Sequence, residues 1–135
     1  MKIVNLILVY NECLSKILMC YRTSDPYKDH YNFLGGKLDI NEDMYHGAYR
    51  ELFEESGISK DDIKLIHFMD YDYPIDNLRM NIFYGILNKE VGLVSEKHPL
   101  SWIDLNEDFF NSKFAGDGNV YHMIQIANHY IKKTE

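Results

Sequence analysis

The segment 41–56 constrains the fold more than any other part of this sequence, because it carries two different faces at helical spacing. Four apolar residues form one stripe at i, i+3, i+4 and i+7: Tyr45, Ala48, Tyr49 and Leu52. Three carboxylates lie beside that stripe at i, i+3 and i+4: Glu51, Glu54 and Glu55. We expect Asn41 to cap the helix, Glu42 and Asp43 to fill its first turn, and Gly57 to end it. The helix should therefore pack against a core on one side and remain acidic on the other.

Strand-like segments flank this helix. They are rich in β-branched and aromatic residues and cover residues 3–10, 16–21, 63–71, 78–87 and 101–105. A polar loop over 24–30, a turn around 74–77 and a closing helix over 119–132 complete the pattern. The sequence contains no internal repeat or linker, so we predict one mixed α/β domain spanning residues 1–135.

Composition and charge limit the partners of this chain. Its 135 residues carry a net charge of −7, which argues against nucleic acid, because a phosphate backbone is bound by clustered Lys and Arg. A small phosphate ligand is compatible with this charge if a cation intervenes. No apolar run is long enough to span a membrane, and Asn11 and Glu12 interrupt the first one too early for a signal peptide. Cys13 and Cys20 are expected to be two buried thiols in a reducing cytoplasm.

The acidic face of the helix allows two interpretations. Like charges at these spacings repel by roughly 0.2–0.5 kcal/mol per pair, which a solvated surface tolerates. A hard divalent cation, however, needs several oxygen ligands at once. Arg50, next to the acids, can orient a carboxylate through a forked hydrogen bond. The acids alone favour a solvated face, and the fixed spacing of the whole segment favours a metal site.

The segment 36–58 resembles the Nudix box, G-x5-E-x7-R-E-U-x-E-E-x-G-U with U aliphatic, at every specified position. The resemblance implies an α/β/α sandwich with a mixed β-sheet between helices. It also implies hydrolysis of a pyrophosphate bond with Mg²⁺ or Mn²⁺. The implied ligands are three carboxylates and one backbone carbonyl, from Glu51, Glu54, Glu55 and Gly36. Glu42, Arg50 and Gly57 would support the geometry of the loop and helix.

The box leaves the general base open. Cations that neutralise a phosphoanhydride expose it to water, and a carboxylate can accept the proton of that water. Glu54 is one candidate for this role, with Glu51 and Arg50 acting beside it. Glu96 is another, because it precedes Trp102 by six residues, as an additional metal-ligand glutamate does in MutT-like members. An exposed loop acid would explain Glu96 as well.

Residues outside the box suggest a nucleotide substrate. Asn32 stands three residues before the Gly35–Gly36 pair, as in MutT-like enzymes that read a purine, and its amide suits a purine edge. Backbone contacts at a strand end would explain it equally well. Near the last helix, three residues are candidates for base contacts: Phe114, Asp117 and Asn119. Asn119 is equally well explained as a helix cap.

Two cations are candidates for contacts with the phosphates, Arg22 and Lys37, although surface ion pairs would explain both. The preferred hypothesis is a MutT-like enzyme that converts a purine nucleoside triphosphate, such as 8-oxo-dGTP, to the monophosphate and pyrophosphate. It would bind only this small molecule, in the cytoplasm, as a monomer or homodimer. Pro74 resembles a proline of ADP-ribose hydrolases, so an ADP-ribose or nucleoside-diphosphate-sugar pyrophosphatase is the alternative. A nucleotide sensor without catalysis is a third hypothesis.

Overall fold

The computed structural model describes residues 1–95, 97–116 and 118–134. The chain runs through these elements in order: β1 (Lys2–Tyr10), β2 (Lys16–Tyr21), β3 (Tyr31–Asn32), β4 (Leu34–Lys37), α1 (Met44–Ser56), β5 (Ile66–Tyr73), the 3₁₀ helix η1 (Pro74–Asp76), β6 (Leu78–Ile86), β7 (Leu100–Asp104) and α2 (Asn119–Thr134). Every predicted strand and both predicted helices are present, with ends shifted by a few residues. Neither helix in the described part of the chain is long and apolar enough to cross a membrane.

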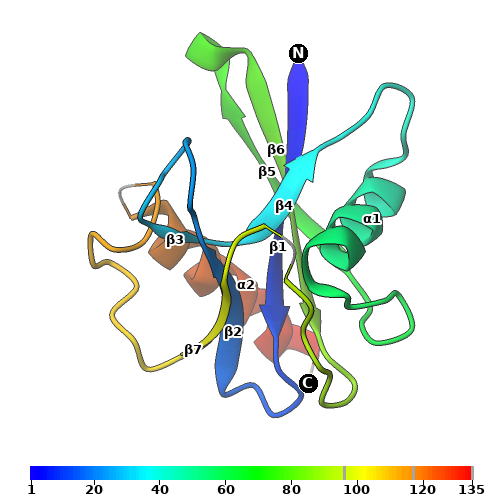
Figure 1. The fold of residues 1–135 in the computed structure, drawn as a ribbon, viewed down its shortest axis with the longest axis vertical. Helices are drawn as coiled ribbons and strands as arrows, with labels where there is room; N and C mark the ends of the chain where they lie inside the picture. The colour runs from blue at the N-terminus through cyan, green and yellow to red at the C-terminus, as the bar shows by residue number, and fades with distance from the viewer. Residues whose placement is uncertain (96, 117, 135) are drawn as a thin grey trace.

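The sheet is mixed and is built around β1 (Figure 1). Its main path runs β3-β2-β1-β6-β5, with β4 paired to β1 and β7 paired to β2. β1 and β6 are parallel and stay in register from Lys2 opposite Leu78 to Tyr10 opposite Ile86. The β1–β2, β1–β4, β2–β3, β2–β7 and β5–β6 pairs are antiparallel.

The two helices cover opposite faces of this sheet. Along β1, Ile7 and Val9 point to the α1 side and pack with Leu52. Leu8 and Tyr10 point to the other side and pack with residues of α2, among them Val120, Met123, Ile124, Ala127 and Ile131. This alternation follows from the two-residue period of a strand. The predicted α/β/α sandwich is confirmed.

The apolar stripe predicted for α1 is only partly buried. Ala48 and Leu52 have no exposed surface, whereas Tyr45 and Tyr49 reach past the core to the edge strand β5 and to Leu65, the residue before it. The Tyr49 hydroxyl accepts a hydrogen bond from the Leu65 N–H at 2.9 Å, and the Tyr45 hydroxyl accepts one from the His67 N–H at 3.1 Å. The tyrosines thus fix α1 against the sheet through both rings and hydroxyls.

The predicted start of α1 is wrong by two residues. Asp43, not Asn41, is the N-cap, and its Oδ2 accepts hydrogen bonds from the backbone N–H groups of Tyr45 and His46. Asn41 has a φ of 64° and lies in the preceding loop, outside the helix. The predicted end is confirmed, because Gly57 adopts a left-handed conformation and donates its N–H to the Phe53 carbonyl.

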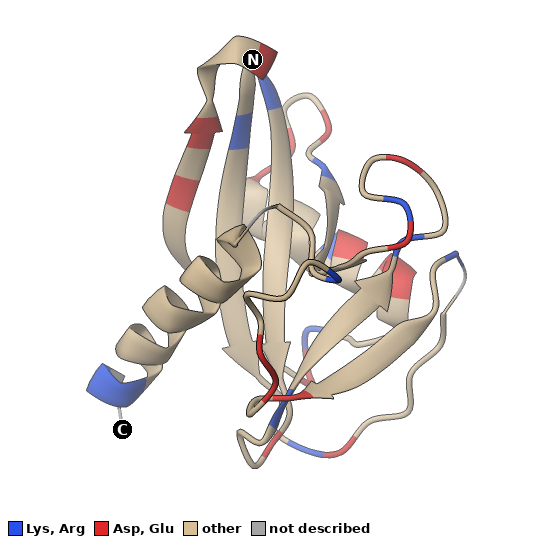
Figure 2. Cartoon of the chain, turned by 90° about the vertical axis from the view of Figure 1, so that its left-hand side faces the viewer, with Lys and Arg blue, Asp and Glu red and all other residues tan. Residues whose placement is uncertain are grey.

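Two smaller expectations are also corrected. Cys20 is buried, but Cys13 is exposed, because it lies in the β1–β2 turn. Asn119 is the first residue of α2, so it is not the N-cap of that helix. The Lys and Arg residues of α2 are Lys132 and Lys133, both at its C-terminal end, where the helix dipole stabilises positive charge (Figure 2).

Candidate active site

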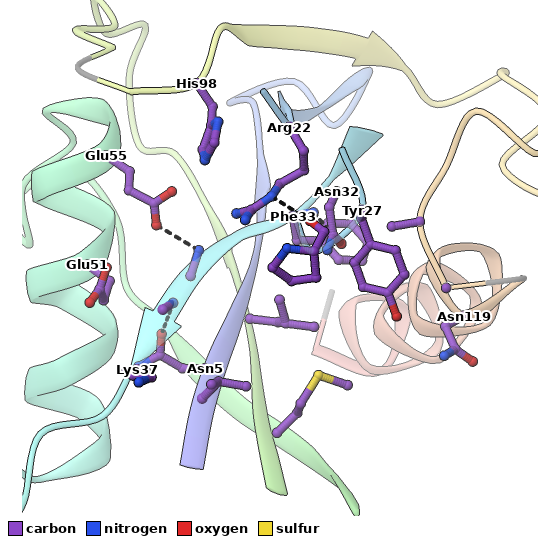
Figure 3. Close-up of a pocket in the computed structure, with 18 of the residues that line it drawn as sticks. Asn5, Arg22, Tyr27, Asn32, Phe33, Lys37, Glu51, Glu55, His98 and Asn119 are labelled. Carbon is purple, nitrogen blue, oxygen red and sulfur yellow. Dashed lines mark hydrogen bonds between the residues drawn. The ribbon is translucent and has the colours of Figure 1, made fainter. Parts of the chain in front are cut away.

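A cavity of about 690 Å³ opens between β4, α1 and the start of α2 (Figure 3). Its volume is within the range typical of small-molecule sites. One end is lined by carboxylates of α1 and by the cations Arg22 and Lys97. The other end is mainly apolar, and its lining comes from β1, β6 and α2: Val4, Leu6, Met80, Val120 and Met123.

The glycine pair of β4 brings α1 close to the cavity. Gly36 has no side chain, and a Cβ placed there would lie 2.5 Å from Oε2 of Glu51. The Gly35 N–H donates a hydrogen bond of 2.9 Å to Oε1 of Glu55. Glu51 and Glu55 therefore lie against the backbone of β4, and both line the cavity.

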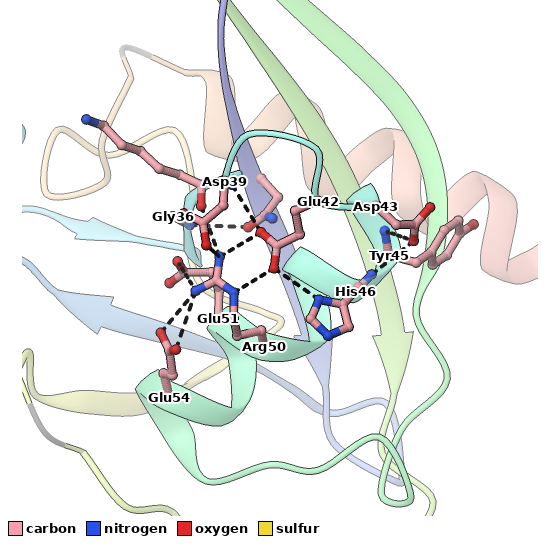
Figure 4. Close-up of polar contacts among 11 residues, drawn as sticks. Gly36, Asp39, Glu42, Asp43, Tyr45, His46, Arg50, Glu51 and Glu54 are labelled. Carbon is pink, nitrogen blue, oxygen red and sulfur yellow. Dashed lines mark hydrogen bonds and ion pairs between the residues drawn. The ribbon is translucent and has the colours of Figure 1, made fainter.

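Arg50 connects the loop before α1 to its acids (Figure 4). Its Nε and Nη2 donate to the two carboxylate oxygens of Glu42 at 2.7 and 2.9 Å, a forked pair. Nη2 also donates to the Lys37 carbonyl at 3.2 Å. On the other side, Nη1 donates to Glu51 at 3.1 Å and to Glu54 at 3.3 Å. Glu42 and Arg50 thus occupy the positions that a supporting role for the loop and helix requires.

The surroundings of these acids shift their pKa values in opposite directions. Hydrogen bonds from Arg50, assisted by the Asp39 N–H, lower the pKa of Glu42 to about 2. Burial raises the pKa of Glu55 to about 7, and the Gly35 N–H and distant cations only partly offset this. Burial also raises the pKa of Glu51, despite the nearby Arg50. At Glu51 and Glu55 the nearby positive charge is therefore too small to offset the cost of burying a carboxylate anion.

The acids fit a divalent cation, but they are not gathered around one point. The described residues include no group of three or more His, Cys, Asp or Glu side chains placed to hold a metal ion. Both Glu51 and Glu54 pair with Arg50, but the side chain of Glu54 is 54% exposed and that of Glu51 is 16% exposed. Two half-buried carboxylates short of positive charge are the oxygen donors that Mg²⁺ prefers. All three acids, Glu51, Glu54 and Glu55, line the cavity and could contribute oxygen ligands to a cation once their side chains rearrange.

Four of the predicted substrate-binding residues line the same cavity: Arg22, Asn32, Lys37 and Asn119. Arg22 lies at the acidic end and donates its Nε to the Pro26 carbonyl at 3.1 Å. Oδ1 of Asn32 accepts the Phe33 N–H at 2.8 Å, so its amide NH₂ is the group that remains for a ligand. Nδ2 of Asn119 donates to the Tyr73 hydroxyl at 2.8 Å.

Phe114, a predicted base-contact residue, lies in the core and does not line the cavity. Phe114 is only 3% exposed, and its ring packs in the α2-side core against Tyr31 and Phe109. Its neighbour Ala115 lines the cavity instead. Glu96 and Asp117 lie outside the described residues. Pro74 is the first residue of η1, a position that suits proline. It is not among the residues that line the cavity, although Tyr73 and Asp76 are.

Sequence reasoning missed several lining residues, most notably Asn5, Tyr27 and His98. Asn5 is 1% exposed, and its Oδ1 accepts the Gly36 N–H at 3.2 Å while its Nδ2 has no hydrogen-bond partner within the described structure. A polar residue inside the apolar run of 3–10 was the one available signal. Tyr27 and His98 lie in loops, whose course no periodicity predicts.

Comparison with known proteins agrees with this architecture. The NUDIX domain family matches residues 2–118. An 8-oxo-dGTP diphosphatase of Buchnera aphidicola is 36% identical over 73 residues, which cover 53% of this chain and 58% of that protein. The chain thus matches less than two thirds of the length of that curated relative.

Many solved structures share the fold, and two of them illustrate it. A bifunctional NMN adenylyltransferase/ADP ribose pyrophosphatase from Francisella tularensis has a TM-score of 0.75 at 20% identity, covering 95% of this chain and 40% of that one. A MutT structure, from work on Aliivibrio salmonicida and Vibrio cholerae, has a TM-score of 0.72 at 19% identity, covering 95% of this chain and 98% of that one. The family match includes β4, α1 and the cavity between them, and by that match the chain belongs to the NUDIX family.

Proposed function

We propose that this protein hydrolyses a phosphoanhydride bond of a nucleoside triphosphate and releases the monophosphate and pyrophosphate. The observation that carries the proposal is the pair of half-buried acids, Glu51 and Glu55, facing β4 at one end of a cavity whose other end is apolar. Such a cavity suits a ligand with a highly charged part and a flat apolar part. A nucleotide has both.

The charged end would hold the phosphates. Glu51 and Glu55, with the Gly36 carbonyl, would bind Mg²⁺ or Mn²⁺, and Arg22 and Lys37 would contact phosphate oxygens directly. A bound cation would neutralise charge on those oxygens and lower the pKa of a nearby water molecule. This explains how an acidic protein could bind an anionic ligand.

Glu54 is the proposed proton acceptor in this reaction. It lies one helical turn from Glu51 and is the most exposed of the three acids, so water can reach it. Its contact with Arg50 would orient the carboxylate towards that water. Glu96 remains a second candidate for this role or for metal binding, by its position in the sequence alone.

The apolar end would hold the base. The amide of Asn32 offers a donor, and Asn119, with Tyr73 behind it, offers a second polar group beside the apolar surface. Two amides around an apolar slot suit a purine edge, and the similar Buchnera aphidicola protein is named an 8-oxo-dGTP diphosphatase. We therefore propose a purine nucleoside triphosphate, with 8-oxo-dGTP as the first compound to test.

The test is a panel of nucleotides incubated with the protein in Mg²⁺, in Mn²⁺ and in EDTA, with products identified by ³¹P NMR. Cation-dependent release of pyrophosphate from a purine triphosphate is expected. Release of AMP and a phosphosugar from ADP-ribose would instead favour the alternative class. Tight binding of nucleotides without any cleavage would favour a sensor. Glu54→Gln should fold normally and lose nearly all turnover, and an unchanged rate would remove Glu54 from the mechanism.

A further inference from the structure

His98 is a buried histidine in the wall of the cavity. It is 5% exposed and lies in the segment that leads into β7. The backbone of this segment is anchored, because the Tyr21 N–H donates to the Pro99 carbonyl at 2.9 Å and the Ser95 hydroxyl donates to the His98 carbonyl. The ring therefore has a fixed position and is not a side chain on a free loop.

One hydrogen bond determines the tautomer of His98. The Thr23 backbone N–H lies 3.1 Å from Nδ1 of the ring. A backbone amide can only donate, so Nδ1 must be the acceptor and cannot carry a hydrogen. In the neutral ring the hydrogen is then on Nε2.

The ring is directed towards the place where the phosphates are proposed to bind. Figure 3 shows the imidazole of His98 projecting between Glu55 and Arg22. All three residues line the same cavity. The Nδ1 side of the ring is occupied by Thr23, so the Nε2 side is the one available to a ligand.

We propose that His98 is a substrate-contacting residue, whose Nε2–H donates a hydrogen bond to a phosphate oxygen of a pyrophosphate group held between the α1 carboxylates and Arg22. The inference deepens the proposed function, because the ligand it assigns is the phosphoanhydride part of the substrate. A neutral donor is well suited to this position. It adds a directional bond to the anion and adds no positive charge that would compete with the cation for Glu55.

Two substitutions separate this role from a structural one. The amide of Asn can replace Nδ1 of histidine as the acceptor for Thr23, but it does not reach the place of Nε2. The longer Gln can place an NH₂ group near Nε2, but it loses the acceptor for Thr23. A substrate contact therefore predicts that His98→Asn is the more damaging for ligand binding, and a purely structural role predicts that His98→Gln is.

The probe is inorganic pyrophosphate in Mg²⁺, titrated into the full chain by calorimetry. His98→Asn should weaken its binding about tenfold or more, as expected for loss of a hydrogen bond to a charged acceptor. His98→Gln should stay within about threefold of the unsubstituted protein, since it keeps a donor there. Binding of Mn²⁺ alone should be unchanged in both variants. Equal losses in the two variants, or normal binding by His98→Asn, would overturn the assignment.

A measurement on the unsubstituted protein keeps the inference testable if either variant is unstable. In ¹H–¹⁵N spectra of the imidazole groups, the His98 Nε2 proton should move downfield when pyrophosphate and Mg²⁺ are added. An unmoved resonance at saturation would refute the contact. Failure of the proposed function gives a different result. If the protein binds pyrophosphate through His98 but cleaves no nucleotide, the proposed hydrolase function is wrong and the His98 contact stands.

Discussion

Gly36→Ala is the substitution that most directly tests whether the close approach of α1 to β4 matters for function. The added Cβ would lie 2.5 to 2.7 Å from the three terminal atoms of the Glu51 side chain. Contacts this short cannot persist, and the flexible end of Glu51 can move more easily than the backbone of β4, which is paired to β1. We therefore expect the carboxylate of Glu51 to be displaced and the sheet to remain intact.

The displacement sets the size of the effect. Restoring an ordinary van der Waals separation requires the carboxylate to move by about 1 Å, and a misplacement of this size in an active site can reduce the rate on the order of 100-fold. It would also strain the 3.1 Å hydrogen bond from Arg50 Nη1 to Oε1 of Glu51. Stability should suffer less, by about 1 kcal/mol, because the clash is with the end of a flexible side chain.

The assay compares three properties of the same variant: turnover in Mg²⁺, affinity for Mn²⁺ by electron paramagnetic resonance, and unfolding in urea. Gly92→Ala is the matched control, because a Cβ at Gly92 would have no atom within 4 Å. The control should match the unsubstituted protein in turnover and Mn²⁺ affinity. If Gly36→Ala also retains both, the position of Glu51 against Gly36 is irrelevant to function and the proposed site is wrong.

Three further predictions concern single side chains. The raised pKa of Glu55 favours the protonated form in the folded protein, so without metal its contribution to stability is complete below pH 4.5 and is lost as the pH rises to about 7. Urea unfolding in EDTA should show this decline, Glu55→Gln should remove it, and an identical pH profile in the two proteins would contradict it. Asn5→Leu leaves the N–H of Gly36 without its acceptor and should cost about 1–3 kcal/mol of unfolding free energy, and a variant as stable as the parent would refute this. Cys13 is exposed, whereas burial removes Cys20 from solvent and raises its pKa to about 11. Ellman's reagent should therefore modify only Cys13 rapidly, and fast reaction of both thiols would show that the core around Cys20 opens.

The sequence predicted the parts of the fold that depend on local periodicity. The apolar and acidic faces of α1 could be read directly from residue spacing, and the run over 3–10 could be read as a strand. The start of α1 was misplaced because Asn41 and Asp43 are both good capping residues, and the choice between them depends on the loop that Arg50 holds through Glu42. Local propensity contains no information about that long-range contact.

Residue spacing alone could group only the acids of the candidate site, because they lie close together in the sequence. The spacing of the acids placed them on one helix, but it could not show that Glu54 would pair with Arg50 while Glu55 bonds to Gly35. Phe114 was a candidate because it precedes the last helix, where the resemblance places a base-reading loop, but its side chain is buried in the core. His98 could not have been selected at all, because its partner Thr23 is 75 residues away.

The two ends of the cavity are supported by different cores, and this has a consequence for how such a protein can change. Acids on α1 rest on the cluster around Leu52, whereas Met80 and Met123 belong to the α2 side of the sheet. A mutation at Met123 can therefore reshape the apolar end while the carboxylates keep their positions. Under the proposed function, preference for a new base could evolve by such substitutions, one at a time, with the bond-breaking chemistry inherited unchanged.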